Sequence, residues 1–128
     1  MTTKYIDVGD GKWGILLCYD YYLLDYDDMW AIMRAFGMSN QKSNEALKVL
    51  GGLNSGMTIS NDSIRMSAVF ISDTTSESEW WNTLNHELLH VVTAIIDYYG
   101  EPYYGEPAAY LQGHLMKKIV EKVGSPCK

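Results

Sequence analysis

The sequence contains little cysteine, which argues against a disulfide-stabilised secreted domain. Only two of its 128 residues are cysteine, Cys18 within an apolar run and Cys127 next to the last residue. Neither belongs to a Cys-x-x-Cys pair or to a dense cysteine framework. The cysteine content therefore fits a reducing compartment best.

Basic residues are also in the minority. The chain has 10 Lys and Arg against 16 Asp and Glu, which gives a formal net charge of -6. Affinity for nucleic acid rests largely on Lys and Arg neutralising phosphates. The only close basic pair, Lys117 and Lys118, falls near the end of an expected helix, where it complements the helix dipole. We therefore expect no nucleic-acid partner.

Long apolar runs are absent too. The longest, around residues 14–18 and 88–96, are far shorter than the roughly 20 residues that span a bilayer. Residues 1–7 lack the apolar stretch and the small-residue cleavage site of an export signal. We expect a cytoplasmic protein with no membrane partner.

Residues 1–128 fit a single domain that does not need a metal merely to fold, so a metal bound here would be functional.

The first half of the chain is expected to form two hairpins with two helices between them. Apolar runs, alternation of apolar and polar residues, and turn residues mark the strands, whereas helical spacing and glycine stops mark the helices. The expected elements are strands at 5–8 and 12–19, helices at 26–36 and 43–50, and strands at 57–60 and 64–72.

Two further helices are expected in the second half. Ser76 is followed three residues later by Glu79, the pairing that caps a helix N-terminus reciprocally, and it predicts a helix from Ser76 to Tyr98. Pro107 favours a first helical turn, and apolar residues at helical spacing then continue to Gly124.

The residues that point to chemistry are His86-Glu87-Leu88-Leu89-His90, in the middle of the first of these helices. Side chains four apart share a helix face, so both imidazoles can bind one ion. Glu87 lies to one side of this pair, where it can act as a base on water that the ion activates. The spacing therefore predicts a zinc site with Glu87 as general base.

A third zinc ligand is predicted by chain reach. From His90 to Tyr98 the helix advances about 12 Å at about 1.5 Å per residue, and residues 99–105, when extended, can return about 23 Å at about 3.3 Å per residue. Glu106 then stands at the start of the last helix. Glu101 is the competitor, but it lies only three residues past Tyr98, where the chain has barely begun to return. Glu106 is therefore favoured.

The segment from Asn85 to His90, followed by Glu106-Pro107-Ala108-Ala109-Tyr110, resembles the zincin metallopeptidases of the gluzincin kind, especially the minimal forms encoded by phages and mobile elements. These families typically continue with Glu-x-x-Ala on a second helix. The resemblance covers about residues 57–120. It implies an α+β, zincin-like domain whose small, mostly antiparallel sheet packs on a catalytic helix, with the third ligand on a C-terminal helix and a substrate strand added at the sheet edge.

Some residues depart from related patterns. Thr93 and Ile96 stand where the metzincin extension needs Gly and His, so that class is excluded. Ala94 stands where thermolysin-like enzymes place an Asp that orients the first imidazole. The groups that would orient these imidazoles are therefore not identified by the sequence.

Other readings stay open. His86 and His90 can be ordinary helix-face histidines that bond to neighbouring groups, and His114, about 12 Å along the last helix from Glu106, fits a surface or supporting position better than a ligand. Four tyrosines crowd the region between the proposed ligands. Any of them can either donate to an oxyanion or anchor the loop by packing, and packing is favoured for each: Tyr98, Tyr99, Tyr103 and Tyr104.

Together these features predict zinc-dependent hydrolysis of peptide bonds. Zinc would be held by His86, His90 and Glu106, Glu87 would be the general base, and the partner would be a protein or peptide substrate. The alternative is a catalytically weak or inactive zinc-binding module, for interaction or structure, such as one from a phage or mobile element.

Overall fold

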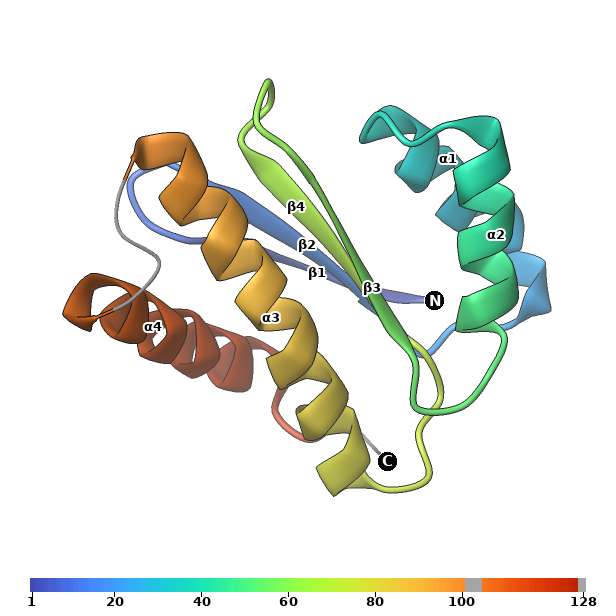
Figure 1. Cartoon of the computed structure of the whole chain (residues 1–128). Helices are drawn as coiled ribbons and strands as arrows, with labels where there is room; N and C mark the ends of the chain where they lie inside the picture. The colour runs from blue at the N-terminus through green and yellow to red at the C-terminus, as the bar shows by residue number, and fades with distance from the viewer. Residues whose placement is uncertain (101–104, 127–128) are drawn as a thin grey trace.

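This computed structural model describes residues 1–100 and 105–126 of the chain. Figure 1 follows the chain through its helices and strands. In chain order these are β1 (Thr2–Asp7), β2 (Gly14–Tyr19), η1 (Leu23–Asp25, one turn of 3-10 helix), α1 (Tyr26–Ala35), α2 (Asn40–Leu50), β3 (Gly56–Asn61), β4 (Met66–Ile71), α3 (Glu77–Tyr99) and α4 (Glu106–Val123).

The strands form one mixed sheet in the order β1-β2-β4-β3. The two hairpins predicted from the sequence, β1 with β2 and β3 with β4, are confirmed as antiparallel pairs. β2 and β4 join them in parallel, with Gly14 opposite Met66. The second hairpin differs from the expected strands 57–60 and 64–72 in its bounds, since β3 spans Gly56–Asn61 and β4 spans Met66–Ile71. β4 begins at Met66 because Arg65 closes the turn by donating its backbone N–H to the Asp62 carbonyl at 3.3 Å.

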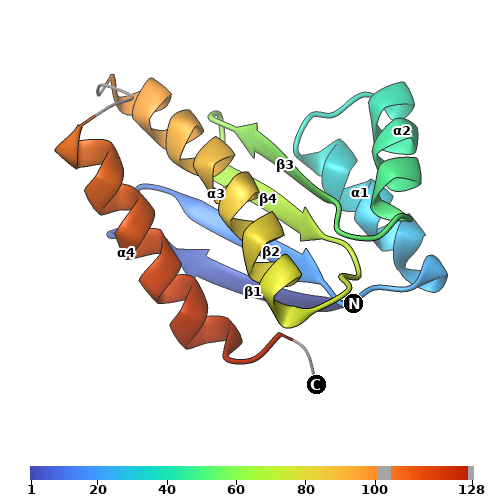
Figure 2. The ribbon, with the colours of Figure 1, turned by 60° about the horizontal axis from the view of Figure 1, so that its bottom comes forward.

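Helices cover both faces of the sheet (Figures 1 and 2). α1 and α2 pack on one face, where Phe70 of β4 meets Met29 and Met33. α3 and α4 pack on the other, where Leu17 of β2 meets Leu88 and other apolar residues. Strands buried on both faces have nearly continuous apolar sequences, which explains the runs in β2 and β4.

The long helix α3 begins and ends where the sequence indicates. Ser76 caps it by accepting a hydrogen bond from the Glu79 backbone N–H at 3.1 Å. Gly100 ends it in the left-handed conformation, with φ of 73°, which glycine adopts without steric cost. Its buried stripe holds residues from Leu84 to Ile96 against the sheet. The predicted helix over 76–98 is therefore confirmed.

The architecture is thus a small α+β domain with a four-stranded mixed sheet and, among the residues described, four α-helices. Two of its three strand pairings are antiparallel. The zincin fold implied by the resemblance is not confirmed. None of the helices in residues 1–100 and 105–126 combines the length and the apolar character needed to cross a membrane.

The cap of α3 gives a stability prediction. Ser76→Ala removes the acceptor of the Glu79 N–H, so the free energy of unfolding should fall by about 1 kcal/mol. Chemical denaturation followed by circular dichroism measures it. Ser63→Ala, in the exposed turn after β3, is the control and should change stability by less than about 0.5 kcal/mol. Equal effects of the two changes would contradict the capping role.

Candidate functional site

His86 and His90 lie side by side on α3. Their ring centroids are 5.3 Å apart with an interplanar angle of 70°, as expected for side chains one helical turn apart. Both residues are exposed, and the His86 side chain is 71% accessible. The structure therefore brings together the two predicted imidazole ligands at the surface of the helix.

Glu87 is the buried member of the motif. Only 5% of its surface is exposed. The Thr58 hydroxyl lies 2.9 Å from Glu87 Oε1 and 3.2 Å from the backbone carbonyl of the same residue, so it is placed to donate to either oxygen. The other carboxylate oxygen, Oε2, lies 3.8 Å from His86 Nε2. The carboxylate is thus anchored on one side by β3 and faces the histidines on the other.

Gly56 makes this arrangement possible. A Cβ added to Gly56 would lie 2.8 Å from Glu87 Cγ and 2.9 Å from Thr83 Cγ2, closer than carbon atoms approach without displacement. β3 and α3 can therefore touch here only because residue 56 has no side chain. Neither Gly56 nor Thr58 is singled out by the sequence, since their partner is about thirty residues away along the chain.

A groove of about 510 Å³ runs between β3 and α3 over these residues. β3 is an edge strand: within residues 1–100 and 105–126 it pairs with β4 on one side and with no strand on the other. Thr58 and Glu87 line the groove together with both histidines. Backbone groups on the outer side of an edge strand are available to pair with another extended chain. The groove therefore places a carboxylate and two imidazoles beside a strand that can accept a peptide.

A second groove, of about 580 Å³, separates α3 from α4. The Gln112 amide on α4 donates to Asn85 Oδ1 on α3 at 3.2 Å, and Ala108 lines the α4 side. His86 and Thr93 line both grooves. His86 therefore lies between the two grooves, whereas His90 lines only the groove beside β3.

The structure does not assemble the predicted set of three metal ligands. Within residues 1–100 and 105–126, no group of three or more His, Cys, Asp or Glu side chains is placed to hold a metal ion. Glu106, the exposed first residue of α4, is not grouped with His86 and His90. Its helix packs on the Asn85 side of α3, whereas Glu87 faces β3. Glu101 lies outside the described residues.

Comparisons with known proteins give the resemblance no support: no protein-family model, no curated protein and no solved structure matches this chain. Together with the missing three-ligand group, this overturns the resemblance to the gluzincins. Two imidazoles fit the nitrogen ligands that zinc prefers, but catalytic zinc sites use three protein ligands. The described residues therefore do not complete such a site.

Other candidate residues have structural roles. His114 Nε2 lies 2.9 Å from the Val8 carbonyl, in hydrogen-bonding contact with the end of the first strand and away from the other histidines. Tyr98 packs edge-on against Trp13 with ring centroids 5.7 Å apart, and the Tyr99 hydroxyl donates to the Lys12 carbonyl at 2.7 Å. Tyr98 and Tyr99 thus contact residues of the loop between β1 and β2; Tyr103 and Tyr104 lie outside the described residues.

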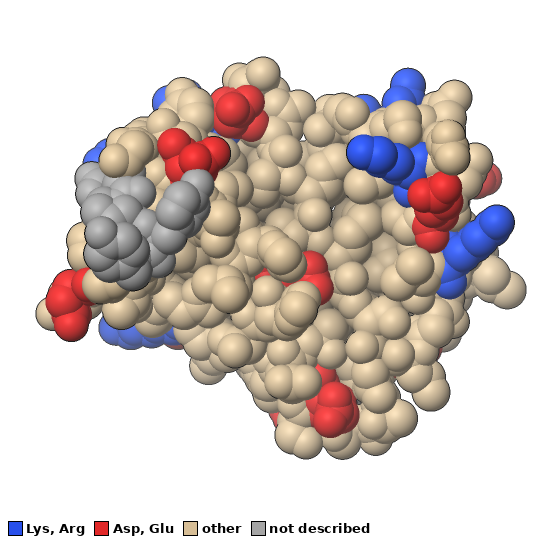
Figure 3. All heavy atoms as spheres, viewed as in Figure 1, with Lys and Arg blue, Asp and Glu red and all other residues tan. Residues whose placement is uncertain are grey.

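The described residues offer no reactive thiol, and the face drawn in Figure 3 has no cluster of basic side chains. Cys18 is fully buried, and burial raises the pKa of its thiol to about 12, so the nucleophilic thiolate is scarce at neutral pH. On the face drawn in Figure 3, the Lys and Arg side chains of the described residues lie toward the margins, with no basic patch over the middle.

The contact at Gly56 yields a prediction. Gly56→Ala should destabilise the protein by about 1–3 kcal/mol, the range for overpacking, because the new methyl group meets Glu87 and Thr83. Gly113→Ala is the matched control: its Cβ meets nothing within 4 Å, and in helix α4 it should stabilise by up to about 1 kcal/mol. Urea denaturation measures both, and equal stability of wild type and Gly56→Ala would contradict the close approach.

Proposed function

We propose that this protein hydrolyses peptide bonds in the groove between α3 and β3, with Glu87 as general base and zinc held by His86 and His90. The observation that carries the proposal is the Glu87 carboxylate. It is 5% exposed, yet it lines an open groove beside two histidines. Among the described residues, the ion pair of Glu87 is with His86 and not with Lys or Arg. Burying a carboxylate without such a cation costs free energy, so its presence beside the groove favours a chemical role.

The contacts of Glu87 suit a base. Thr58 can donate to Oε1 at 2.9 Å, which fixes the orientation of the carboxylate. Oε2, on the side of His86, is left to accept a proton from a water molecule in the groove. A general base must stand within hydrogen-bond reach of the proton it takes. Having taken it, the carboxylic acid can pass the proton to the leaving amine.

The histidines suit a metal ion. Exposed imidazoles one turn apart on a rigid helix keep their ring nitrogens available to an ion from solvent. Zinc, when bound, supplies Lewis acidity that makes water acidic near neutral pH and polarises a carbonyl group. The third ligand remains the sequence-based prediction, Glu106, which the structure does not group with the histidines.

The edge strand supports a peptide substrate. An extended peptide that pairs with the free side of β3 gains backbone hydrogen bonds without needing a particular sequence. Thr58 of β3 touches Glu87 directly, so a peptide on this strand runs past the base. Pairing with the strand would hold a scissile carbonyl near the carboxylate, which is the positioning that hydrolysis requires.

The second candidate function is a peptide-binding module without hydrolysis. The observation that favours it is the absence of a three-ligand metal group among the described residues. Such a module would use the same edge strand and groove, with Glu87 serving to fix β3 against α3 through Thr58. Hydrolysis requires Glu87 as a base and the histidines as metal ligands. Binding alone requires only that Glu87 hold β3 against α3.

Metal binding is predicted to depend on two of the three histidines. Isothermal titration with zinc should give about one equivalent for wild type, and His86→Ala or His90→Ala should weaken binding by more than about 100-fold, since even the loss of a supporting residue costs 10–100-fold. His114→Ala is the control and should bind like wild type, because His114 contacts Val8 instead. No zinc uptake by wild type would remove the metal from the proposal. Glu106→Ala in the same titration tests the predicted third ligand.

Catalysis is predicted to depend on the Glu87 carboxylate. Glu87→Gln keeps the size of the side chain and an oxygen for Thr58, but it removes the base, so chelator-sensitive peptide cleavage should fall by about 10² to 10⁴-fold. Mass spectrometry of a peptide library measures cleavage. Glu121→Gln, an exposed charge loss on α4, should leave it unchanged.

Peptide binding separates the two candidate functions. Unchanged cleavage by Glu87→Gln contradicts the proposed mechanism. Peptide binding without cleavage in wild type favours the binding module.

A further inference from the structure

Three consecutive apolar side chains project from the surface just after β2. Tyr22, Leu23 and Leu24 are 64%, 80% and 83% exposed, and they form the start of η1 and the residue before it. Single exposed apolar residues are ordinary, but a contiguous run is a feature of binding surfaces. Nothing among the described residues covers this run, so its exposure calls for a partner.

An apolar hollow of about 330 Å³ lies beside this run. Tyr21 and Leu50, 7% and 1% exposed, form its floor, and Leu23 and Leu53 stand at its rim. Gly51 also lines the hollow. A Cβ added there would lie 3.0 Å from the Tyr26 hydroxyl, so the absence of a side chain at residue 51 leaves room beside Tyr26. The volume is at the lower end of the roughly 300–1,000 Å³ of ligand pockets, which suits one or two apolar side chains.

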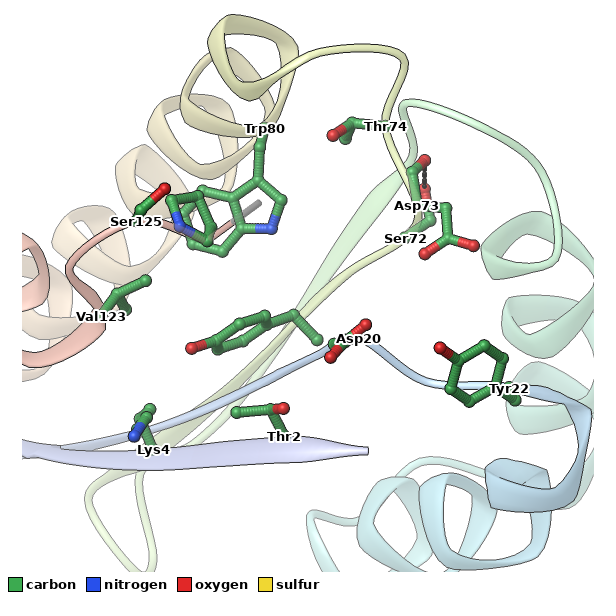
Figure 4. A pocket seen from close by; sticks show the side chains of 12 residues that line it. Thr2, Lys4, Asp20, Tyr22, Ser72, Asp73, Thr74, Trp80, Val123 and Ser125 are labelled. Atoms are coloured by element: carbon green, nitrogen blue, oxygen red, sulfur yellow. Dashed lines mark hydrogen bonds between the residues drawn. The ribbon is translucent and has the colours of Figure 1, made fainter. Parts of the chain in front are cut away.

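Carboxylates lie beside the apolar hollow. Asp73 lines both the apolar hollow and a neighbouring polar hollow of about 640 Å³, which Asp20 also lines. Figure 4 shows Asp20, Asp73 and Tyr22 toward one side of the polar hollow, with Lys4 toward the other. Asp27 and Asp28 follow on the first turn of α1. Among the described residues that line the apolar hollow, none is Lys or Arg.

We propose that the surface formed by Tyr22, Leu23, Leu24 and Leu53 with the apolar hollow, hereafter the η1 surface, docks a cationic amphipathic segment of a partner protein. An apolar side chain of that segment enters the hollow, and its Lys or Arg side chains pair with Asp73 and Asp20. The charges disfavour the main alternatives: in a symmetric contact a second copy would bring its own carboxylates against these, and an anionic membrane would be repelled.

The η1 surface is independent of the proposed hydrolysis. The residues that line the apolar hollow and those that line the groove between α3 and β3 have no member in common. A partner held here could therefore be bound whether or not the groove cleaves peptides, and the two proposals fail separately.

The test uses the full chain and three fluorescent synthetic peptides of about 18 residues, long enough to form a helix. One has Leu on one helical face and Lys on the other, the second has the same composition with Leu spread around the helix, and the third replaces Lys by Glu. Fluorescence anisotropy should show that the first binds at least tenfold more tightly than the others, and that added salt weakens it.

Variants locate the binding. Leu23→Ser with Leu24→Ser should weaken binding of the first peptide by at least about tenfold. Asp73→Asn alone should weaken it by about two- to fivefold, the range for an exposed ion pair. Val120→Ser, which changes an aliphatic residue 46% exposed on α4, is the matched control and should bind like wild type. Circular dichroism checks that each variant is folded; exposed positions should tolerate these changes.

Four results would overturn the proposal. The first two are equal binding of the amphipathic and spread peptides, and binding unaffected by the Leu23 and Leu24 changes. The third is self-association in analytical ultracentrifugation that those changes abolish, which would identify a second copy as the occupant. The fourth is binding to neutral lipid vesicles that the same changes abolish, which would identify a lipid surface.

Discussion

The close approach of β3 to α3 at Gly56 is the constraint on which the candidate site depends. It allows the Thr58 hydroxyl to reach the Glu87 carboxylate at 2.9 Å, and it leaves no room for a Cβ. Because α3 is held to the sheet by its buried stripe, this contact fixes the height of the helix above the sheet edge. The histidines, one turn apart on the same helix, take their position from it.

Much of the fold follows from local patterns in the sequence. Turn residues and alternation mark the two hairpins. The helix predicted from Ser76 to Tyr98 differs from α3 by one residue at each end. The spacing of His86 and His90 likewise predicts their juxtaposition, because four residues on a helix always return to the same face. These features depend on neighbours in the chain, so one sequence suffices to reveal them.

Features that depend on distant segments were not predictable in the same way. Chain reach establishes that Glu106 can return toward His90, but it does not tell on which side of α3 the last helix packs. In the structure α4 packs through Gln112 against the Asn85 side of α3. Thr58 and Gly56 have no local pattern that marks them as partners of Glu87. The exposure of Leu23 and Leu24 could not be predicted either, since an apolar residue in a sequence is expected in the core.

The parallel pairing of β2 with β4 has a consequence for folding. Each hairpin joins neighbouring segments, and each can close quickly through its own turn. The pairing of Gly14 with Met66 instead joins strands that are separated along the chain by α1, α2 and β3, since parallel strands need a crossover. Closing such a long loop slows folding. Until it closes, β2 and β4 each carry an unpaired edge, and this interval is when the chain is most exposed to pairing with another molecule.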